Sequence, residues 1–522
     1  MSPGGLAHSA AAALRSREHR ALQHFDDVVG GPARRGVIVM LACVLALDSA
    51  DKATVGAVGV QLERGLHIGN AGLGLLVAVT SIMGGLGAIP AGGLVDRVRR
   101  THLLPAAIAL WSVAMIVSGV AVSFSMLLIT RLVLGAIVAT AGPSVASLTG
   151  DYFPGSERAR IYGFIISGEL VGAAFGFVVS GEVAKYLSWR FSFALLAVPG
   201  LVLAWVIWRH LPEPARGGQS RLAPGAQRIM GEDAIDANAD AAPAGETDYQ
   251  PGRGDELTAQ AVKRRSVQPR EQLVLHEDPA RMSLWRTALY VLRVSTNVRL
   301  IVASALGYFF FAGLRTFAVV YVRGHFGIGQ SEATLLLGVI VIASIAGALL
   351  GGRVADRLIA GGRLTGRLLV AAGSYAAAAV ILGPAIATTS LAVAVPLYIL
   401  GAAALAGPNP PLDAARLDIM PARLWGRAEG VRTLLRSFAE ALAPLLFGVI
   451  SERLAAHHHN ANAASSGFGA NSSAQGLEYT FLIMLAPLLI SAFLMLRAGR
   501  TYPRDIATAI ANEDHRTAAE VR

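Results

Sequence analysis

The stretch GGLVDRVRR (residues 92–100) follows one long apolar segment of the sequence, and GGRVADR (residues 351–357) follows another. Both contain Gly-x-x-x-Asp-Arg, which pairs these residues: Gly92 with Gly352, Asp96 with Asp356, and Arg97 with Arg357. A second pair of segments, DYFPGSERARIYG (151–163) and DIMPARLWGRAEG (418–430), matches at a constant offset of 267 residues. Because composition alone does not repeat motifs at a fixed offset, the sequence predicts two homologous halves, as in many transporters.

The composition around these motifs is typical of a membrane protein. Of the 522 residues, 54% are hydrophobic and only 15% are charged, and the mean hydropathy is +0.53. A water-soluble fold cannot bury so much apolar surface, whereas stretches of about 20 apolar residues cross a bilayer as helices. Such stretches lie near residues 36–60, 71–95, 103–122, 126–148, 161–184, 189–209, 299–322, 332–354, 366–388, 391–412, 428–450 and 478–497. We therefore predict an all-α membrane protein with twelve transmembrane helices in two six-helix bundles, related by a pseudo-twofold repeat.

The predicted spans divide the chain into five parts. These are an N-terminal segment (1–35), an N-terminal bundle (36–209), a central loop (210–297), a C-terminal bundle (298–500) and a tail (501–522). Arginines are frequent in alternate connections and scarce in the others. Since cytoplasmic loops carry the excess of Lys and Arg, we expect a multi-pass protein of the bacterial plasma membrane with both termini in the cytoplasm. The net charge of +10 then reflects orientation and not nucleic-acid binding.

Two segments outside the spans have a distinctive composition. MSLWRTALYVLR (282–293) ends the central loop and predicts either a basic amphipathic helix on the membrane surface or an extension of the seventh span. HHHNANAASSGFGANSS (457–473) is interpreted as a solvated spacer and not as a metal site.

No motif for chemistry is found in the sequence. A Walker loop needs Gly-Lys-Ser/Thr, and none of the three lysines follows a glycine. We therefore expect no enzymatic activity, no cofactor and no metal site. The expected partners are a small-molecule substrate, protons and the lipid bilayer, and the chain is expected to act as a monomer.

Residues 92–100 resemble the signature G-x-L-x-D-R-x-G-R-R/K that the major facilitator superfamily carries between its second and third spans. Arg99 stands where a glycine is usual, and the matching residues are Gly92, Leu94, Asp96, Arg97 and Arg100. RLVLG (131–135) in the fourth span and Trp189-Arg190 at the sixth resemble further motifs of the superfamily. The resemblance covers both bundles and implies a secondary transporter that works by alternating access.

Within that superfamily the chain resembles the bacterial spinster-type subgroup. Asp51-Lys52 is similar to the acidic-basic pair of that subgroup, and LPEPARG (211–217) is similar to its proline-rich stretch after the sixth span. The subgroup usually carries a glutamate shortly after the residue equivalent to Arg131, and this chain has Val138 and Ala139 there. The resemblance implies export of an amphipathic or lipid-like compound.

The repeated Asp-Arg motifs predict a conformational latch at the cytoplasmic ends of the bundles. An aspartate there can accept hydrogen bonds from arginine and from a helix N-terminus, and such contacts break when the bundles rock. The predicted latch residues are Gly92, Asp96, Arg97, Arg100, Gly352, Asp356 and Arg357. Glycines at four-residue spacing, as at 168, 172 and 176, predict close helix contacts, either between the bundles or within one.

Ionisable residues inside spans are costly unless they face water or a partner. Asp51, Glu169 and Asp48 are the predicted proton-coupling residues, with Asp51 preferred. The predicted substrate cavity contains Lys52, Arg131, Arg315, Arg432, Arg436 and Glu440. The offset of 267 relates Asp48 to Arg315 and Glu169 to Arg436, so acids in one half correspond to bases in the other. The alternative is that Asp51–Lys52 and Arg436–Glu440 are compensated pairs that hold the bundles together.

Three functions are compatible with these features. The first is proton-coupled export of an amphipathic or lipid-like small molecule, from the predicted proton carriers and the resemblance. The second is uptake or exchange of a polar organic anion, from the arginines inside the spans. The third is a non-transporting membrane sensor or scaffold that uses the central loop.

Overall fold

The computed structural model describes residues 26, 29–153, 155–214, 222, 262, 266–275, 282–421, 424–461 and 470–520. Eleven segments within these ranges are helical, long and apolar enough to cross a membrane. The first predicted span is the helix α2 (Pro32–Ala57), which is not one of these eleven and which carries three ionisable residues in its second half: Asp48, Asp51 and Lys52. The predicted all-α membrane fold with two groups of spanning helices is confirmed.

The N-terminal bundle is built from eight helical elements. They are α2, α3 (Gly59–Leu66), α4 (Asn70–Arg97), α5 (Arg100–Gly119), α6 (Phe124–Val138), α7 (Ala141–Tyr152), α8 (Gly155–Tyr186) and α9 (Trp189–His210). α6 and α7 together make the fourth span, and α3 is a short helix that follows the first.

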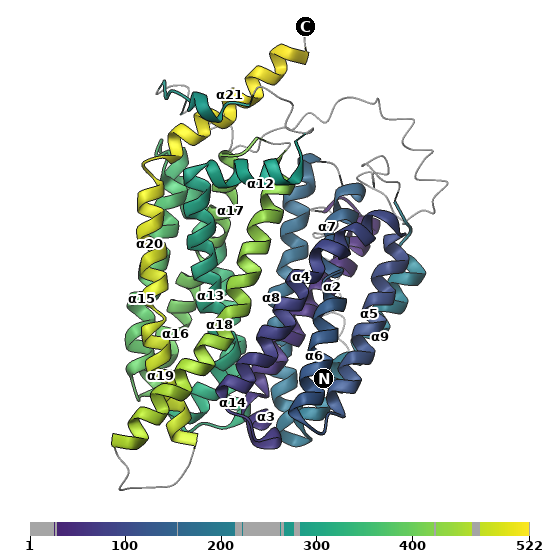
Figure 1. Cartoon of the computed structure of the whole chain (residues 1–522), viewed down its shortest axis with the longest axis vertical. Helices are drawn as coiled ribbons and strands as arrows, with labels where there is room; N and C mark the ends of the chain where they lie inside the picture. The colour runs from purple at the N-terminus through teal and green to yellow at the C-terminus, as the bar shows by residue number, and fades with distance from the viewer. Residues whose placement is uncertain are drawn as a thin grey trace, which may run out of the picture.

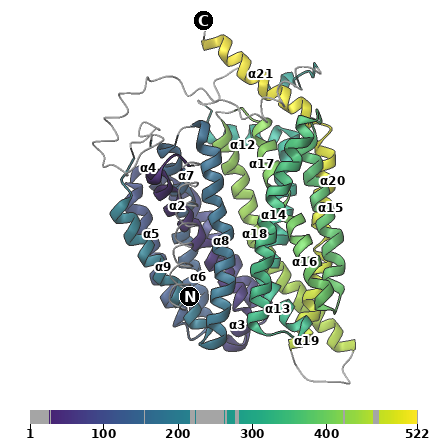
Figure 2. The same ribbon diagram turned by 180° about the vertical axis from the view of Figure 1, so that it is seen from behind.

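The C-terminal bundle lies beside it, with its long axis in the same direction (Figures 1 and 2). Its elements are α13 (Ser295–Phe326), α14 (Gln330–Ala360), α15 (Gly366–Ala387), α16 (Leu391–Ala406), α17 (Asn409–Asp418), α18 (Trp425–Ala461), α19 (Ala470–Ile483) and α20 (Ala486–Ala498). The helical backbone of α18 continues through the three histidines at 457–459, whose side chains lie outside the described residues.

We call the end of the bundles where α9 ends and α13 begins the linker end, and the opposite end the far end. Two further helices lie at the linker end: α12 (Leu284–Arg293) and α21 (Tyr502–Glu520) (Figure 1). A short 3-10 helix, η1 (Glu271–Leu273), belongs to a strip of the central loop that contacts α21. α12 is a separate helix from α13, since Val294 breaks the helical backbone between them.

Both the fourth and the tenth span are interrupted at the same place in the repeat. Pro143 and Pro410 are related by the offset of 267, and each lacks the N–H that would bond to the carbonyl four residues earlier. Those carbonyls belong to Ala139, the residue directly after α6, and to Ala406, the last residue of α16. The halves therefore share a backbone irregularity as well as motifs.

Candidate functional site

Six ionisable side chains from four helices interact near the middle of the spans. Lys52 Nζ donates to Asp48 Oδ2 at 2.5 Å, one turn apart on α2. Lys52 also interacts electrostatically with Arg315 on α13 and Glu440 on α18. Glu169 on α8 interacts with Arg436 on α18 and with Lys52. Since α2 and α8 belong to one bundle and α13 and α18 to the other, these charges meet across the bundle interface.

Aromatic rings accompany the basic residues of the C-terminal bundle. Arg436 Nε lies 3.1 Å from Glu440 Oε1, and its guanidinium carbon lies 4.3 Å from the centroid of the Tyr308 ring. The guanidinium carbon of Arg315 lies 5.8 Å from the centroid of Phe311. A planar cation over an aromatic face is held in orientation and still presents its edge to an anion.

The six groups, which we call the charge cluster, consist of three acids and three bases: Asp48, Glu169, Glu440, Lys52, Arg315 and Arg436. With all six ionised their formal charges sum to zero. The structure thus brings together most of the residues predicted for proton coupling and the substrate cavity. Arg432, also predicted for the cavity, is buried on the linker side of Arg436 in α18.

Asp51 and Arg131 form a separate pair inside the N-terminal bundle. Arg131 Nη1 lies 2.7 Å from Asp51 Oδ1, and each side chain is 2% exposed. The Arg131 guanidinium stacks over Phe193, with 4.6 Å from its carbon to the ring centroid. Burial among the helices of one bundle keeps this pair apart from the charge cluster.

The alternative in which Asp51 pairs with Lys52 is therefore not found. Successive residues of an α-helix point about 100° apart, whereas residues four apart lie on one face. Lys52 accordingly pairs with Asp48, and Asp51 points to Arg131 on α6. The alternative pair Arg436–Glu440 is present, and its partners are also four residues apart.

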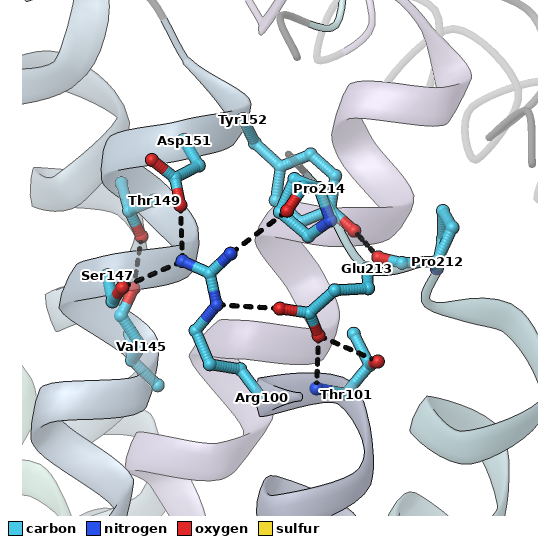
Figure 3. A network of polar contacts seen from close by, with 10 residues as sticks. All are labelled: Arg100, Thr101, Val145, Ser147, Thr149, Asp151, Tyr152, Pro212, Glu213 and Pro214. Atoms are coloured by element: carbon cyan, nitrogen blue, oxygen red, sulfur yellow. Dashed lines mark hydrogen bonds and ion pairs between the residues drawn. The ribbon is translucent and has the colours of Figure 1, made fainter. Parts of the chain in front are cut away.

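At the linker end, Arg100 is the centre of a buried network (Figure 3). Its side chain is 1% exposed and donates to Glu213 Oε1 at 2.8 Å, to Ser147 Oγ at 2.7 Å and to the carboxylate of Asp151. The backbone N–H and hydroxyl of Thr101 donate to the other oxygen of Glu213 at 2.8 and 2.9 Å. Burial opposes ionisation of Glu213, but these hydrogen bonds hold the pKa of its carboxyl below the usual value.

The same ion pair occurs in the other half. Arg367 at the start of α15 pairs with Asp418 at the end of α17, and the offset of 267 relates this pair to Arg100–Asp151. Tyr502 also donates its hydroxyl to Asp418. Asp151 and Asp418 begin the two matching segments of the repeat, but their arginine partners, which are related by the same offset, were not predicted from the sequence.

The latch is only partly visible. Arg100, predicted to belong to it, joins α5, α7 and the segment after α9, all within the N-terminal half. Asp356 and Arg357 on α14 are exposed at the linker end, and Gly352 faces Pro410. The surroundings of Gly92 and the side chains of Asp96 and Arg97 are not among those that the structure describes. A latch between the bundles stays a prediction, and Arg100 serves a different contact.

The far end is where the bundles are tightly joined. Hydrogen bonds between residues that the structure describes connect them there: Asn70 Nδ2 to Ser451 Oγ at 3.0 Å, Ala71 N to Glu452 Oε1 at 2.8 Å, Gln330 Nε2 to Ala57 O at 2.6 Å, and Lys185 Nζ to Ser331 Oγ at 2.9 Å. A Cβ on Gly74 would lie 2.2 Å from the carbonyl oxygen of Pro444, so α4 and α18 touch backbone to backbone. Apart from the small size of Gly74, nothing in the sequence indicates that these residues join the two bundles.

The glycines singled out in the fifth span serve a different contact. A Cβ on Gly168, Gly172 or Gly176 would lie within 2.5 Å of a backbone oxygen of α2. α2 and α8 belong to the same bundle, so this ladder packs one half internally and does not face the other half.

Comparison with known proteins gives the context of this site. The model described as Major Facilitator Superfamily matches residues 40–444. The chain is 29% identical over 190 residues to a D-galactonate transporter of Escherichia coli O6:H1, covering 35% of this chain and 43% of that one. It is 28% identical over 185 residues to a 4-hydroxybenzoate transporter of Pseudomonas aeruginosa, covering 35% of this chain and 41% of that one. The matches therefore span less than half the length of these curated relatives.

Solved structures share the fold over most of the chain. A bacterial homologue of the human lysosomal transporter Spinster, inward-facing and occupied, superposes with a TM-score of 0.67 at 20% identity, covering 91% of this chain and 98% of that one. A D-xylose–proton symporter superposes with a TM-score of 0.59 at 15% identity, covering 89% and 97%.

Proposed function

Because the chain belongs to the Major Facilitator Superfamily, a family of membrane transporters, we propose that it takes up a small organic anion together with a proton by alternating access. The observation that carries this proposal is the charge cluster. Three bases from both bundles converge at a level of the spans where an unpaired charge is costly. A substrate with a carboxylate can take the place of a protein carboxylate at one of these bases.

Arg436 is the proposed anchor for the substrate carboxylate. Its guanidinium is held between Tyr308 and Glu440, so it is oriented before the substrate arrives. A planar guanidinium binds a carboxylate with two parallel hydrogen bonds, which a lysine cannot do. The relatives named for D-galactonate and 4-hydroxybenzoate both carry organic acids, which supports an anionic substrate here.

Glu169 is the proposed proton carrier. Within the described residues, no hydrogen bond or ion pair engages its carboxylate, and its interactions with Arg436 and Lys52 are electrostatic. The formal charges of the cluster sum to zero, and a monoanion would add one negative charge. Protonation of one carboxylate removes that charge, so one proton per monoanion keeps the site neutral in a medium of low dielectric. Asp51, preferred from the sequence, is assigned here to the buried pair with Arg131.

The structure has the features of an inward-facing state if the linker end is cytoplasmic, as the arginine distribution predicts. The far end is closed by hydrogen bonds and backbone contacts, and Asp356 and Arg357 at the linker end are exposed. As predicted from the sequence, we propose that both termini are cytoplasmic, that the chain acts as a monomer, and that residues 210–297 form a cytoplasmic loop between the two bundles.

The test combines a binding assay on the purified protein with transport into proteoliposomes, with galactonate and 4-hydroxybenzoate as probes and glucose as the uncharged control. Arg436→Gln removes the charge-assisted interaction with the carboxylate, worth about 1.5–3 kcal/mol, and should raise the Kd for the carried anion roughly 10- to 150-fold. Glu169→Gln should abolish uptake driven by a pH gradient but preserve exchange of internal for external anion. The matched control Arg363→Gln alters an exposed arginine outside the cluster and should leave both unchanged.

Two results would reject the proposal. One is anion binding by Arg436→Gln that equals that of the unaltered protein. The other is uptake that ignores the pH gradient in the unaltered protein.

Export of an amphipathic or lipid-like compound stays a prediction. Its support is the fold shared with the bacterial Spinster homologue. The charge cluster argues against it, because six ionisable groups favour a polar substrate over a lipid chain. Lysophospholipids in the same binding assay separate the two: an amphipathic substrate would bind the Arg436→Gln variant with unchanged affinity, because its apolar part carries most of the binding energy.

A further inference from the structure

The helix α12 has two apolar faces, and only one of them packs on the protein. Thr287, Tyr290 and Val291 are buried on the first face, and Val294, the residue directly after the helix, is buried as well. On the opposite face Trp285 is 74% exposed, Leu289 40% and Leu292 44%. Because successive residues are turned by about 100°, these three fall on one stripe directly opposite the buried residues.

Hydrogen bonds fix which face points outward. Tyr290 donates its hydroxyl to the carbonyl of Leu273 at 3.3 Å and accepts from Asn512 Nδ2 at 3.1 Å. Asn297 Nδ2 donates to the carbonyl of Val291 at 3.0 Å. The first two bonds tie α12 to the central loop and to α21, and the third ties it to α13. The exposed stripe cannot turn inward without breaking all three.

The position of α12 matches the level of a membrane surface. α12 is separated from the spanning helix α13 by one residue and lies across the bundle at the linker end (Figure 1). Trp205 and Trp208, in the last turns of α9, are 58% and 63% exposed at the same end of the other bundle. Exposed tryptophans gather at the boundary between headgroups and acyl chains. Trp285 is a third exposed tryptophan at the linker end, on the helix that precedes the C-terminal bundle.

The charge of α12 favours an anionic membrane surface. Arg286 and Arg293 are exposed, seven residues apart and therefore on one flank of the helix. The sequence of α12, LWRTALYVLR, contains no acidic residue. Each arginine near an anionic leaflet strengthens attachment about fivefold.

We propose that α12 is a docking surface for anionic phospholipid, with Trp285, Leu289 and Leu292 inserted at the acyl boundary and Arg286 and Arg293 binding headgroup phosphates. The helix then anchors the central loop and α21 to the bilayer beside the C-terminal bundle. This site is independent of the charge cluster and of the transported substrate.

The test uses the full chain in vesicles with brominated phosphatidylglycerol or brominated phosphatidylcholine, which quench tryptophan on contact. The difference between the unaltered protein and Trp285→Phe isolates the signal of one tryptophan among six. Phosphatidylglycerol should quench Trp285 more strongly than phosphatidylcholine. Arg286→Gln/Arg293→Gln should lower that preference about tenfold or more, and the control Arg363→Gln should not change it.

Three outcomes overturn the proposal. If neither lipid quenches Trp285, the stripe does not face the bilayer. If both lipids quench it equally, or the double arginine variant keeps the preference for phosphatidylglycerol, the arginines do not read headgroup charge. Circular dichroism and thermal unfolding of each variant establish that a lost preference is not a lost fold.

Discussion

Gly74 sits at a close backbone contact between the two bundles, and adding one methyl group there should open the far end. A Cβ on this residue would lie 2.2 Å from the carbonyl oxygen of Pro444, 2.7 Å from its carbon and 3.2 Å from Cα of Leu445. All three atoms belong to the backbone of α18, so no side-chain rotation relieves the overlap. A Cβ on Gly448 would meet the backbone of α4 in the same way, 2.4 Å from the oxygen of Asn70.

The size of the effect follows from this geometry. Ordinary contact begins near 3.4 Å, so α18 and α4 must separate by about 1 Å to admit the methyl group of Gly74→Ala. Overpacking of this kind costs about 1–3 kcal/mol. The cost falls only on the state in which the far end is closed. The ratio of closed to open molecules should therefore fall by roughly 5- to 150-fold.

Pulsed electron paramagnetic resonance can measure that ratio. Spin labels at exposed far-end positions, Leu187→Cys and Arg453→Cys, report the separation of the bundles in a Cys43→Ser background. Gly74→Ala should shift the distance distribution to longer values and slow transport.

Two matched alanines complete the experiment. Gly373→Ala has no atom within 4 Å of the new Cβ and should behave like the unaltered protein. Gly176→Ala meets the oxygen of Ala50 at 2.5 Å inside one bundle, so it should lower thermal stability without changing the distance. A distance distribution for Gly74→Ala that matches that of Gly373→Ala would refute the reasoning.

Three other predictions concern charges outside the cluster. Burial and the nearby Glu452 raise the pKa of Glu63 to about 7, against an ordinary value of 4.5, so its protonated form favours the closed far end. Closure should therefore weaken as the pH rises from about 4.5 to 7. Glu63→Gln should remove this pH dependence in the same distance measurement. Asp51→Asn should cost about 3–5 kcal/mol by leaving Arg131 buried and unpaired, and replacing Arg131 by methionine as well should recover most of the melting temperature. Arg100→Gln should lower the melting temperature without changing the Kd for substrate, because its partners hold one bundle together.

The spans and the pairing of the halves could be predicted from the sequence, because both depend on local patterns. Apolar runs of sufficient length predict helices, and the offset of 267 identifies equivalent residues. The interruption of the fourth span was missed, although Pro143 was visible, because a proline inside an apolar run is compatible with either a kink or a continuous helix. The separate helix α12 was one of two alternatives that its composition left open.

The partners of the buried charges could not be predicted, because pairing depends on which helices are neighbours. Asp51 lies beside Lys52 in sequence but bonds to Arg131, 80 residues away. Periodicity does explain why Lys52 turns to Asp48, since residues four apart share a helix face. The contacts at the far end involve ordinary polar residues such as Asn70 and Ser451, whose role appears only when the two bundles are placed together.

The repeat distinguishes two kinds of charged position. The linker-end pair keeps its identity in both halves, as Arg100–Asp151 and Arg367–Asp418, and each copy joins elements of its own half. At the same offset, Asp48 corresponds to Arg315 and Glu169 to Arg436, so the sign of the charge is reversed where the halves face each other. The buried pair Asp51–Arg131 occurs in one half only, because the offset places Ala318 and Tyr398 at the equivalent positions. A residue that faces the other half is under a constraint of complementarity, which requires opposite charges. We therefore expect the positions with reversed sign to be those at which the two bundles bind an ion between them, and the charge cluster is where the proposed mechanism should be tested first.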